Sequence, residues 1–567
     1  MDAVLLMVVT FVGYILMYRF YGRFISKKIF KINSKNIAPS IALNDGVDYQ
    51  PTKKTILFGH HFTSIAGTGP IVGPAIAVIW GWLPAVLWVF IGSIFIGGLH
   101  DFGTLIISMR NEGKTLGEYS RKYLGNFAHY AVFIVSSILV LIVIAIFGVI
   151  ISLIFNIFPG SVLPVWLQIP IALFIGYMIN SKGQSNLLWS IIGIVLLYGT
   201  VIIGAYYPVV IPDIAGIAPT GIWTILLLIY AFVASVLPVK TLLQPRDYIN
   251  SHQLIVALLL LFVGIIASAI MLPDFGIVAP AIVQNPDGAP SLFPFIFVVI
   301  ACGAVSGFHS LVSSGSSSKQ ISNEADAQFI GYGSMLSESV LAIFVIIATT
   351  AGIGILNTTD AGLMLSGEAA WNQHYHSWEA AAGLGSKIDA FVTGSSNMIS
   401  SLGIPQQVTL IIMGVFVASF AGTTLDTSTR LQRYIISEII PKSAPAFLKN
   451  RFFLSGIAVI TAGLLAFSTG VDGKGALTLW PIFGNLNQIL AMLGLIIITS
   501  YLRYKENKFF WVAGIPALFM SIICICVGTS NMQDYFASSN YLLIAINSVV
   551  LLSAVSLLIV AIIKIFK

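Results

Sequence analysis

Charged residues are scarce in this chain. Asp, Glu, Lys and Arg together make up 9% of its 567 residues, against about 25% in a typical soluble domain. Hydrophobic residues make up 57%, and the mean hydropathy is +0.94. A soluble protein of this composition would expose large apolar patches, whereas a lipid bilayer covers them. The composition therefore excludes a soluble domain and predicts a membrane protein.

Cysteine is also rare. The three cysteines, Cys302, Cys524 and Cys526, all lie in apolar runs. Their spacing gives no disulfide framework and no metal-ligand motif, so we expect small buried side chains and no metal site. No sequence resembles a nucleotide-binding P-loop. The net charge of +6 is spread over short loops between apolar runs, which argues against a nucleic-acid partner.

Apolar stretches of the length of a membrane crossing recur along the whole chain. They predict an all-α polytopic membrane protein with about fifteen transmembrane helices. The predicted spans are 3–18, 56–80, 84–108, 129–158, a fifth ending near 180, 187–209, 221–239, 250–272, 292–314, 329–356, 404–425, 453–468, 479–501, 510–527 and 541–566.

The basic residues fix the orientation of these spans. When the chain is threaded this way, all but two of the 28 Lys and Arg residues fall on one side, the exceptions being Lys387 and Lys474. Cytoplasmic loops collect positive charge, so we expect the N-terminus outside and the C-terminus in the cytoplasm. The longest outer segment, 357–403, is too polar to span, and its Trp and Tyr residues suggest an interfacial helix.

The second predicted span contains an interruption. It reads GHHFTSIAGTGPIVGPAIA, with Gly67, Thr68, Gly69, Pro70 and Gly73 close together. Proline removes a backbone donor and glycine lowers the cost of unwinding. Free N–H groups at a broken helix would suit a carboxylate, so we take these five residues as candidate substrate-binding residues. The alternative is a packing motif that lets two helices approach closely.

The seventh span also carries prolines, Pro238 and Pro245. An offset of five spans makes it an inverted counterpart of the second span, which predicts a five-plus-five inverted repeat with discontinuous helices. The expected units are 1–55, with the first span and a basic loop; 56–210 and 211–435, the two halves of the repeat; and 436–567, peripheral spans.

The ninth span is rich in serine. Ser310 is a candidate for binding substrate, and Ser313 and Ser314 are candidates for binding a coupling ion. Hydroxyl groups can complete a cation site, but they also bond to their own helix backbone, and both readings stay open.

Ionisable side chains at membrane depth are functional candidates. We expect His60, His61, Asp101 and His309 to take part in proton coupling, because imidazole and carboxylate groups exchange protons readily. Glu338 and Asp426 are further candidates. For these two the open alternatives are a structural pair between helices and an ordinary helix cap.

Three sequence strings resemble a known family. They are GHHFTSIAGTGPIVGPAIA, WGWLPAVLWVFIGSIFIGGLHDFGTLIISMRNEGKTLGE and FHSLVSSGSSSKQ, and the likeness continues to FAGTTLDTSTRLQRY. They are similar to the carbon starvation protein A family, bacterial inner-membrane transporters of the amino acid–polyamine–organocation superfamily. The resemblance implies a broken-helix inverted-repeat fold and uptake of peptides, or of pyruvate driven by protons, often under nutrient limitation.

We therefore expect a secondary active transporter and no enzyme, most simply a proton–pyruvate symporter without a cofactor. Sodium stays open as the coupling ion. The alternative substrates are short peptides or amino acids, which also present an amine. A membrane enzyme with histidine-bound metal needs histidines on one helix face, which adjacent His60 and His61 do not offer. A nutrient sensor without transport is a distant alternative, because the longest cytoplasmic loop is only 22–55.

Overall fold

The computed structural model describes residues 3–180, 182–358, 362–441 and 443–566. Helices account for most of these residues, which confirms an all-α membrane protein. Residues 359–361 of the predicted outer segment and the terminal residues Met1 and Lys567 lie outside this description. The two short strands are β1 (Asn357–Thr358) and β2 (Met364–Leu365), which pair antiparallel.

The α-helices have the following bounds: α1 Ala3–Met17, α2 Pro39–Ala42, α3 Lys54–Ile65, α4 Gly69–Ala77, α5 Trp82–Gly92, α6 Gly98–Met109, α7 Leu116–Leu124, α8 Asn126–Ile157, α9 Val162–Asn180, α10 Asn186–Tyr206, α11 Pro219–Val236, α12 Leu243–Met271, α13 Leu292–Val299, α14 Gly307–Gly315, α15 Gly333–Ile347, α16 Gly367–Tyr375, α17 Trp378–Ala382, α18 Leu384–Ser400, α19 Gln406–Ile439, α20 Arg451–Ala466, α21 Trp480–Tyr504, α22 Trp511–Ala537 and α23 Tyr541–Phe566.

Each of the fifteen predicted apolar runs forms helix. Among the described residues, twelve helices are long and apolar enough to cross a membrane, and the bent pair α3–α4 makes a thirteenth crossing. The other two runs explain the difference. The run 292–314 divides into α13 and α14, and the run 453–468 forms α20, which has 16 residues and is shorter than a full crossing.

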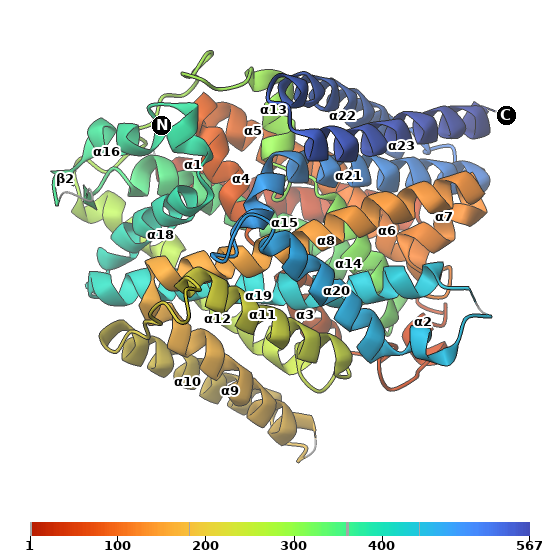
Figure 1. Ribbon diagram of the computed structural model, residues 1–567, viewed down its shortest axis with the longest axis horizontal. Coiled ribbons are helices and arrows are strands. Elements are labelled where there is room, and N and C mark those ends of the chain that lie inside the picture. The colour runs from red at the N-terminus through yellow and green to blue at the C-terminus, as the bar shows by residue number, and fades with distance from the viewer. Residues whose placement is uncertain (1–2, 181, 359–361, 442, 567) are drawn as a thin grey trace.

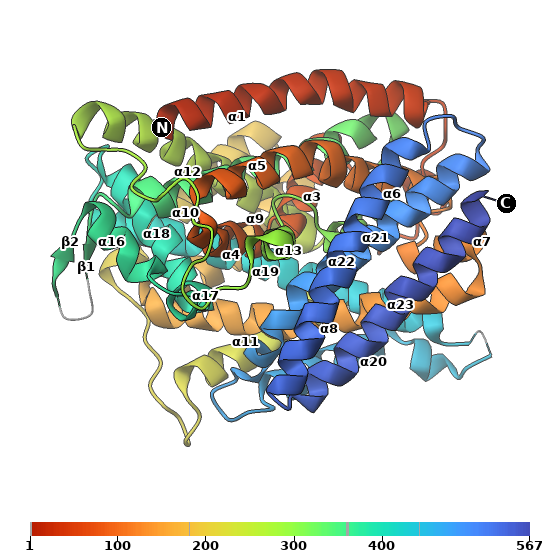
Figure 2. The ribbon, with the colours of Figure 1, turned by 90° about the horizontal axis from the view of Figure 1, so that it is seen from above.

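The long helices α8, α19 and α21 form the centre of the bundle. Helix α8 packs against both α19 and α21, and 94% of the most apolar stretch of α21 is buried. Helices α1 and α23 lie at the periphery, with 28% buried, and the α9–α10 hairpin lies at one edge (Figure 1). Figure 2 shows α1 along the upper edge of the bundle and α23 on the opposite side. The expectation that all spans after residue 435 are peripheral is therefore wrong for α21.

A short segment lies against Arg430 and Arg433 at one end of the bundle, and we call this end the basic end. The segment, residues 43–53, leads into α3 and is named the strap. Its Asp48 carboxylate pairs with Arg430 at 2.8 Å and Arg433 at 3.0 Å. A strap amide also donates to the carbonyl oxygen of Lys319 at 3.1 Å. The strap thus joins α19 to the chain that follows α14.

The predicted interruption of the second span is present. Helix α3 ends at Ile65, α4 begins at Gly69, and the two are bent by 46°. Residues 66–68 between them are unwound. The Gly and Pro residues of this segment thus break the helix where the sequence predicts it.

A second interruption lies in the predicted ninth span, not in the seventh. Residues 300–306 between α13 and α14 are not helical, and Gly303 has φ +88°, which favours glycine. By contrast, α11 is continuous, Pro238 lies after its end, and Pro245 occupies the first turn of α12. Proline is tolerated there because the first-turn N–H groups have no helical partner. Pairing the second span with a broken seventh span was therefore wrong, and the inverted repeat stays a prediction.

Candidate functional site

The two interruptions lie against each other and run in opposite directions. Helix α3 packs on α14 and α4 packs on α13. A Cβ added to Gly69 would lie 2.5 Å from the Sγ atom of Cys302, and one added to Gly73 would lie 2.5 Å from the carbonyl oxygen of Val299. Only residues without a side chain allow this approach. Gly69 and Gly73 therefore allow close helix packing at the same place where the helix is broken.

A cavity of about 800 Å³ opens above the two breaks. Gly69, Gly73, Ala301 and Cys302 are among the residues that line it. The loop before α13 and the helices α17, α21, α22 and α23 supply most of the remaining wall, including Gly288, Pro290, Trp378, Trp480 and Asp534. We call this end of the bundle the vestibule end. The cavity thus leads from the vestibule end to both helix breaks.

The predicted substrate-binding residues divide into two groups. Gly69 and Gly73 line the cavity, whereas Gly67, Thr68 and Pro70 lie at the same break but are not among the residues that line it. The hydroxyl oxygen of Thr68 is fully buried and has no hydrogen-bond partner among the described residues. This hydroxyl group lies beside the first turn of α4 and is therefore available as a hydrogen-bond donor at the break.

The serines of the ninth span serve mainly their own helix. Ser310 donates to the carbonyl oxygen of Gly307 at 2.6 Å, and Ser314 donates to that of Ser310 at 2.6 Å. Ser313 has a buried hydroxyl without a partner among the described residues. Back-bonding of this kind is the ordinary behaviour of serine in a helix. The proposed ion-binding role of Ser313 and Ser314 stays a prediction.

Asp101 and His309, two of the predicted proton-coupling residues, belong to one buried chain of polar contacts. One Asp101 oxygen contacts Nδ1 of His100 at 2.9 Å, and the other contacts Nδ1 of His309 at 2.8 Å. Nε2 of His309 lies 3.1 Å from Oε2 of Glu338. The second Glu338 oxygen accepts from the N–H of Gly303 at 3.0 Å. One imidazole thus bridges two carboxylates at the second break.

All these side chains are fully buried. In a low-dielectric interior a carboxylate is stable only when it is paired or protonated. An imidazolium at His309 can donate to both carboxylates at once, whereas a neutral imidazole can donate to only one. The chain therefore has states that differ by one proton and by their hydrogen bonds.

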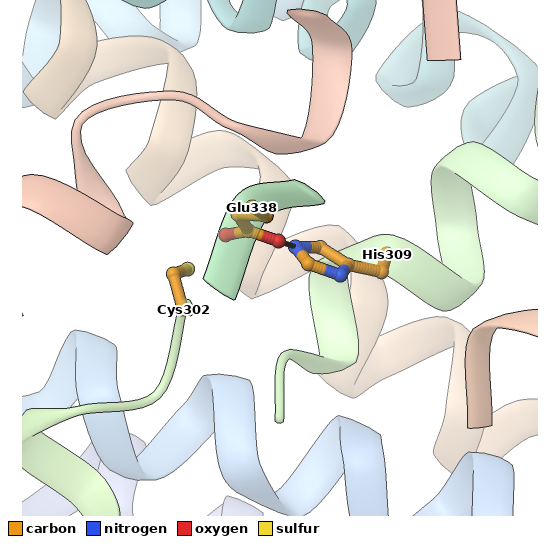
Figure 3. A group of neighbouring side chains, drawn as sticks. All are labelled: Cys302, His309 and Glu338. Carbon is orange, nitrogen blue, oxygen red and sulfur yellow. Dashed lines mark ion pairs between the residues drawn. The ribbon is translucent and has the colours of Figure 1, made fainter. Parts of the chain in front are cut away.

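Cys302 lies beside this chain at the floor of the cavity. Figure 3 shows Cys302 on the segment between α13 and α14, His309 on α14 and Glu338 on α15. One ligand-type atom from each lies within 4.8 Å of the others. Thiolate, imidazole and carboxylate are zinc ligands in principle. The 3.1 Å between Nε2 of His309 and Oε2 of Glu338 fits a shared proton as well as a shared cation.

His60 and His61 occupy a different place, on the basic-end half of the broken span. Nδ1 of His60 contacts Oδ2 of Asp247 at 2.6 Å, and its Nε2 contacts the Ser316 hydroxyl at 3.1 Å. Nδ1 of His61 contacts the Ser317 hydroxyl at 2.7 Å. The two histidines therefore attach α3 to α12 and to the chain after α14.

Asp426 is part of a buried ion cluster and is not a helix cap. It lies within α19 and bonds to the guanidinium of Arg246 and to the hydroxyl of Tyr230. Arg246 also pairs with Asp247 at 2.9 Å. From the sequence we expect Arg246, like the other basic residues, to lie in a loop between spans. It lies instead in the first turn of α12 and is only 4% exposed. The acidic residue that follows it was the available signal for a pair.

These features define a class of protein. Two broken helices of opposite direction meet at membrane depth, at the floor of a cavity, beside buried protonatable groups. This arrangement is that of a secondary transporter, and the chain is a multi-pass membrane protein that transports a small molecule or a peptide.

Comparison with known proteins identifies the family. The chain belongs to the carbon starvation protein CstA family, whose model matches residues 2–527. It is 33% identical to the peptide transporter CstA of Campylobacter jejuni, over 94% of this chain and 81% of that protein. It is also 33% identical to the pyruvate/proton symporter BtsT of Escherichia coli, over 90% of this chain and 79% of that protein.

Among solved structures, a mutant of the manganese transporter of Eremococcus coleocola is similar with a TM-score of 0.49. The sequences are 15% identical, and the match covers 92% of this chain and 99% of the other.

Proposed function

We propose that this chain is a proton-coupled importer of a nutrient that carries a carboxylate group. One observation carries the proposal: an imidazole bridges the carboxylates of Asp101 and Glu338 at the place where the two broken helices meet below the cavity. Substrate and proton would therefore act on the same pair of breaks, as coupled transport requires.

The carboxylate of the substrate would bind at the first turn of α4. The amino end of a helix carries partial positive charge. In the first turn of α4, Pro70 has no N–H, and the N–H groups of Ile71 and Val72 both donate to the carbonyl oxygen of Thr68. Thr68 adds a buried hydroxyl group without a partner among the described residues. Gly69 supplies an N–H at the cavity wall. An anion bound there gains hydrogen bonds without displacing a side chain.

The proton would bind at His309. A proton there gives an imidazolium that donates to Asp101 and Glu338 together, and its loss leaves one carboxylate without that donor. Since Glu338 also accepts from Gly303, whose backbone is part of the second break, protonation acts directly on the shape of the break. This is a physical route from proton binding to a conformational change.

The basic end is assigned to the cytoplasm because short loops rich in Lys and Arg stay inside. The cavity then faces outward, and the strap, His60 and His61 close the inner side. An outward-facing cavity beside a closed inner end is the loading state of an importer.

Pyruvate and a short peptide both carry a carboxylate and both fit this scheme. BtsT of Escherichia coli is named for pyruvate and protons, and the similar CstA proteins for peptides. The cavity volume of about 800 Å³ is in the range of sites for ligands much larger than a three-carbon acid. This observation favours the short peptide.

The test uses the full chain in proteoliposomes with an imposed pH gradient. We expect labelled alanyl-alanine or pyruvate to accumulate when the inside is alkaline, and sodium replacement by choline to leave uptake unchanged. His309→Gln should abolish gradient-driven accumulation but retain exchange of substrate across the bilayer. The matched control is His376→Gln, since His376 is exposed. Uptake that ignores the gradient, or a His309→Gln variant with normal coupling, would refute the proposal.

A further inference from the structure

One wall of the cavity is polar and comes from a single helix, α22. The residues of this wall are spaced so that they share one helix face: Val527, Ser530, Asn531, Asp534, Tyr535 and Ser538 just beyond the helix end. The α4 side of the cavity, by contrast, is lined by Gly69, Gly73 and Ile76. The C-terminal helices therefore supply the polar side chains of the cavity.

Asp534 is the only residue with a charged side chain among the described residues that line the cavity. No ion pair joins it to a cation within the part of the chain that the structure describes. Its carboxylate is exposed and thus available to a solute. A single negative charge in a cleft raises the local concentration of cations and lowers that of anions.

A second observation points to a ligand at the same wall. Tyr535 lines the cavity and is 6% exposed, and its buried hydroxyl has no hydrogen-bond partner among the described residues. A buried hydroxyl usually has a partner. Trp378 and Trp480 also line the cavity, and aromatic rings attract ammonium groups. A carboxylate, a free hydroxyl and aromatic rings together suit a primary ammonium group.

The position of this wall in the chain is also informative. The family model matches residues 2–527, so Ser530, Asn531, Asp534 and Tyr535 all lie beyond the matched segment. The helix breaks and the His309 chain lie inside it. The polar wall therefore lies outside the segment that the family model matches.

We propose that this face of α22 binds the protonated amine of the substrate and that Asp534 is a specificity-determining residue. The inference rests on the proposed function and deepens it. The substrate would place its carboxylate at α4 and its ammonium group at Asp534, so that the distance between the two sites selects for chain length. A monocarboxylate without an amine would use only the first site.

The experiment compares alanyl-alanine with N-acetyl-alanyl-alanine, which differ in the charge of one nitrogen. Their competition constants against labelled alanyl-alanine are measured in proteoliposomes, and stabilisation of the purified protein is measured in parallel. In the wild type we expect acetylation to weaken binding about two- to fivefold, the upper range for an exposed ion pair. Salt should reduce this difference.

The variants separate recognition from folding. Asp534→Asn should bind both dipeptides equally, Asp534→Glu should restore the preference, and the exposed outer-loop control Asp274→Asn should behave as wild type. Equal binding of both dipeptides by the wild type, or a preference that survives in Asp534→Asn, would overturn the inference. Gradient-driven uptake would persist in either case, whereas its absence for every compound would refute the proposed function instead.

Discussion

Substitution of Gly73 by alanine tests whether the contact between the two breaks is needed for transport. A Cβ at this position would lie 2.5 Å from the carbonyl oxygen of Val299 and 3.4 Å from Cα of Ile300. Real Cβ contacts shorter than 3.0 Å are essentially absent. Since the neighbouring atoms are backbone and the interior is close-packed, α4 and α13 must separate by about 0.5 Å.

The expected change in stability is small. Alanine is favoured over glycine within a helix by about 0.5–1 kcal/mol, whereas overpacking costs about 1–3 kcal/mol, so the net destabilisation is at most about 2.5 kcal/mol. At about 2.1 cal/mol/K per residue the unfolding entropy of this chain is about 1.2 kcal/mol/K, so the midpoint falls by no more than about 2 °C.

The expected change in transport is larger. A misplacement of about 1 Å at a site of chemistry can cost about a hundredfold, so a shift of half that size should reduce uptake about tenfold. The assay is initial uptake of alanyl-alanine in proteoliposomes, with the thermal midpoint measured on the same preparation. The control is Gly422→Ala in α19, where an added Cβ meets nothing within 4 Å. Normal uptake by Gly73→Ala would refute the view that the breaks must touch.

Two further predictions concern charges outside the membrane-spanning segments. Asp48→Asn should speed amide exchange in the strap, because Arg430 and Arg433 lose their partner. Burial raises the pKa of Asp48, but the guanidinium groups of Arg433 and Arg430 outweigh burial and lower the pKa to about 2. In the wild type the stabilisation by this ion pair is therefore complete above a pH of about 4 and is lost only as the pH falls towards 2. Lys387→Met should remove a pH dependence of thermal stability. Burial lowers the pKa of Lys387 to about 7 from 10.5. Between these two pH values the unfolded chain binds more protons than the folded chain, so the stability of the wild type rises with pH in that window.

Both predictions have matched controls. Asp326→Asn removes a half-buried carboxylate, and Lys474→Met removes an exposed lysine. Strap exchange that is unchanged in Asp48→Asn would show that the backbone contacts alone hold the strap. A stability slope that persists in Lys387→Met would assign the titration to another group.

The first helix break could be predicted from the sequence because its cause is local. Gly67, Gly69, Pro70 and Gly73 weaken the helix within one short segment, and no distant partner is needed to unwind it. The run of apolar segments likewise predicts the helices, because each must satisfy its own backbone in lipid.

The second break could not be predicted in this way because distant residues hold it open. The carbonyl oxygen of Ile300 accepts from the indole of Trp88, and the N–H of Phe308 donates to Asn487 at 2.8 Å. Glu338 accepts from the N–H of Gly303. The prolines near residue 240 misled the prediction, since proline in a first turn is compatible with an intact helix. Cys302 gave no signal, because its neighbours in space come from other helices.

The tethers of the broken span suggest how its halves move. His60 and His61 attach α3 to the basic end, whereas the carbonyl oxygen of Ala75 in α4 accepts from the hydroxyl of Tyr375 in α16 at 2.7 Å. Because the unwound residues lie between these two sets of bonds, one half can be released while the other stays fixed. Opening of the basic end would therefore cost the bonds of α3 and of the strap but leave the cavity floor at α4 in place, which is what alternation around a bound substrate requires.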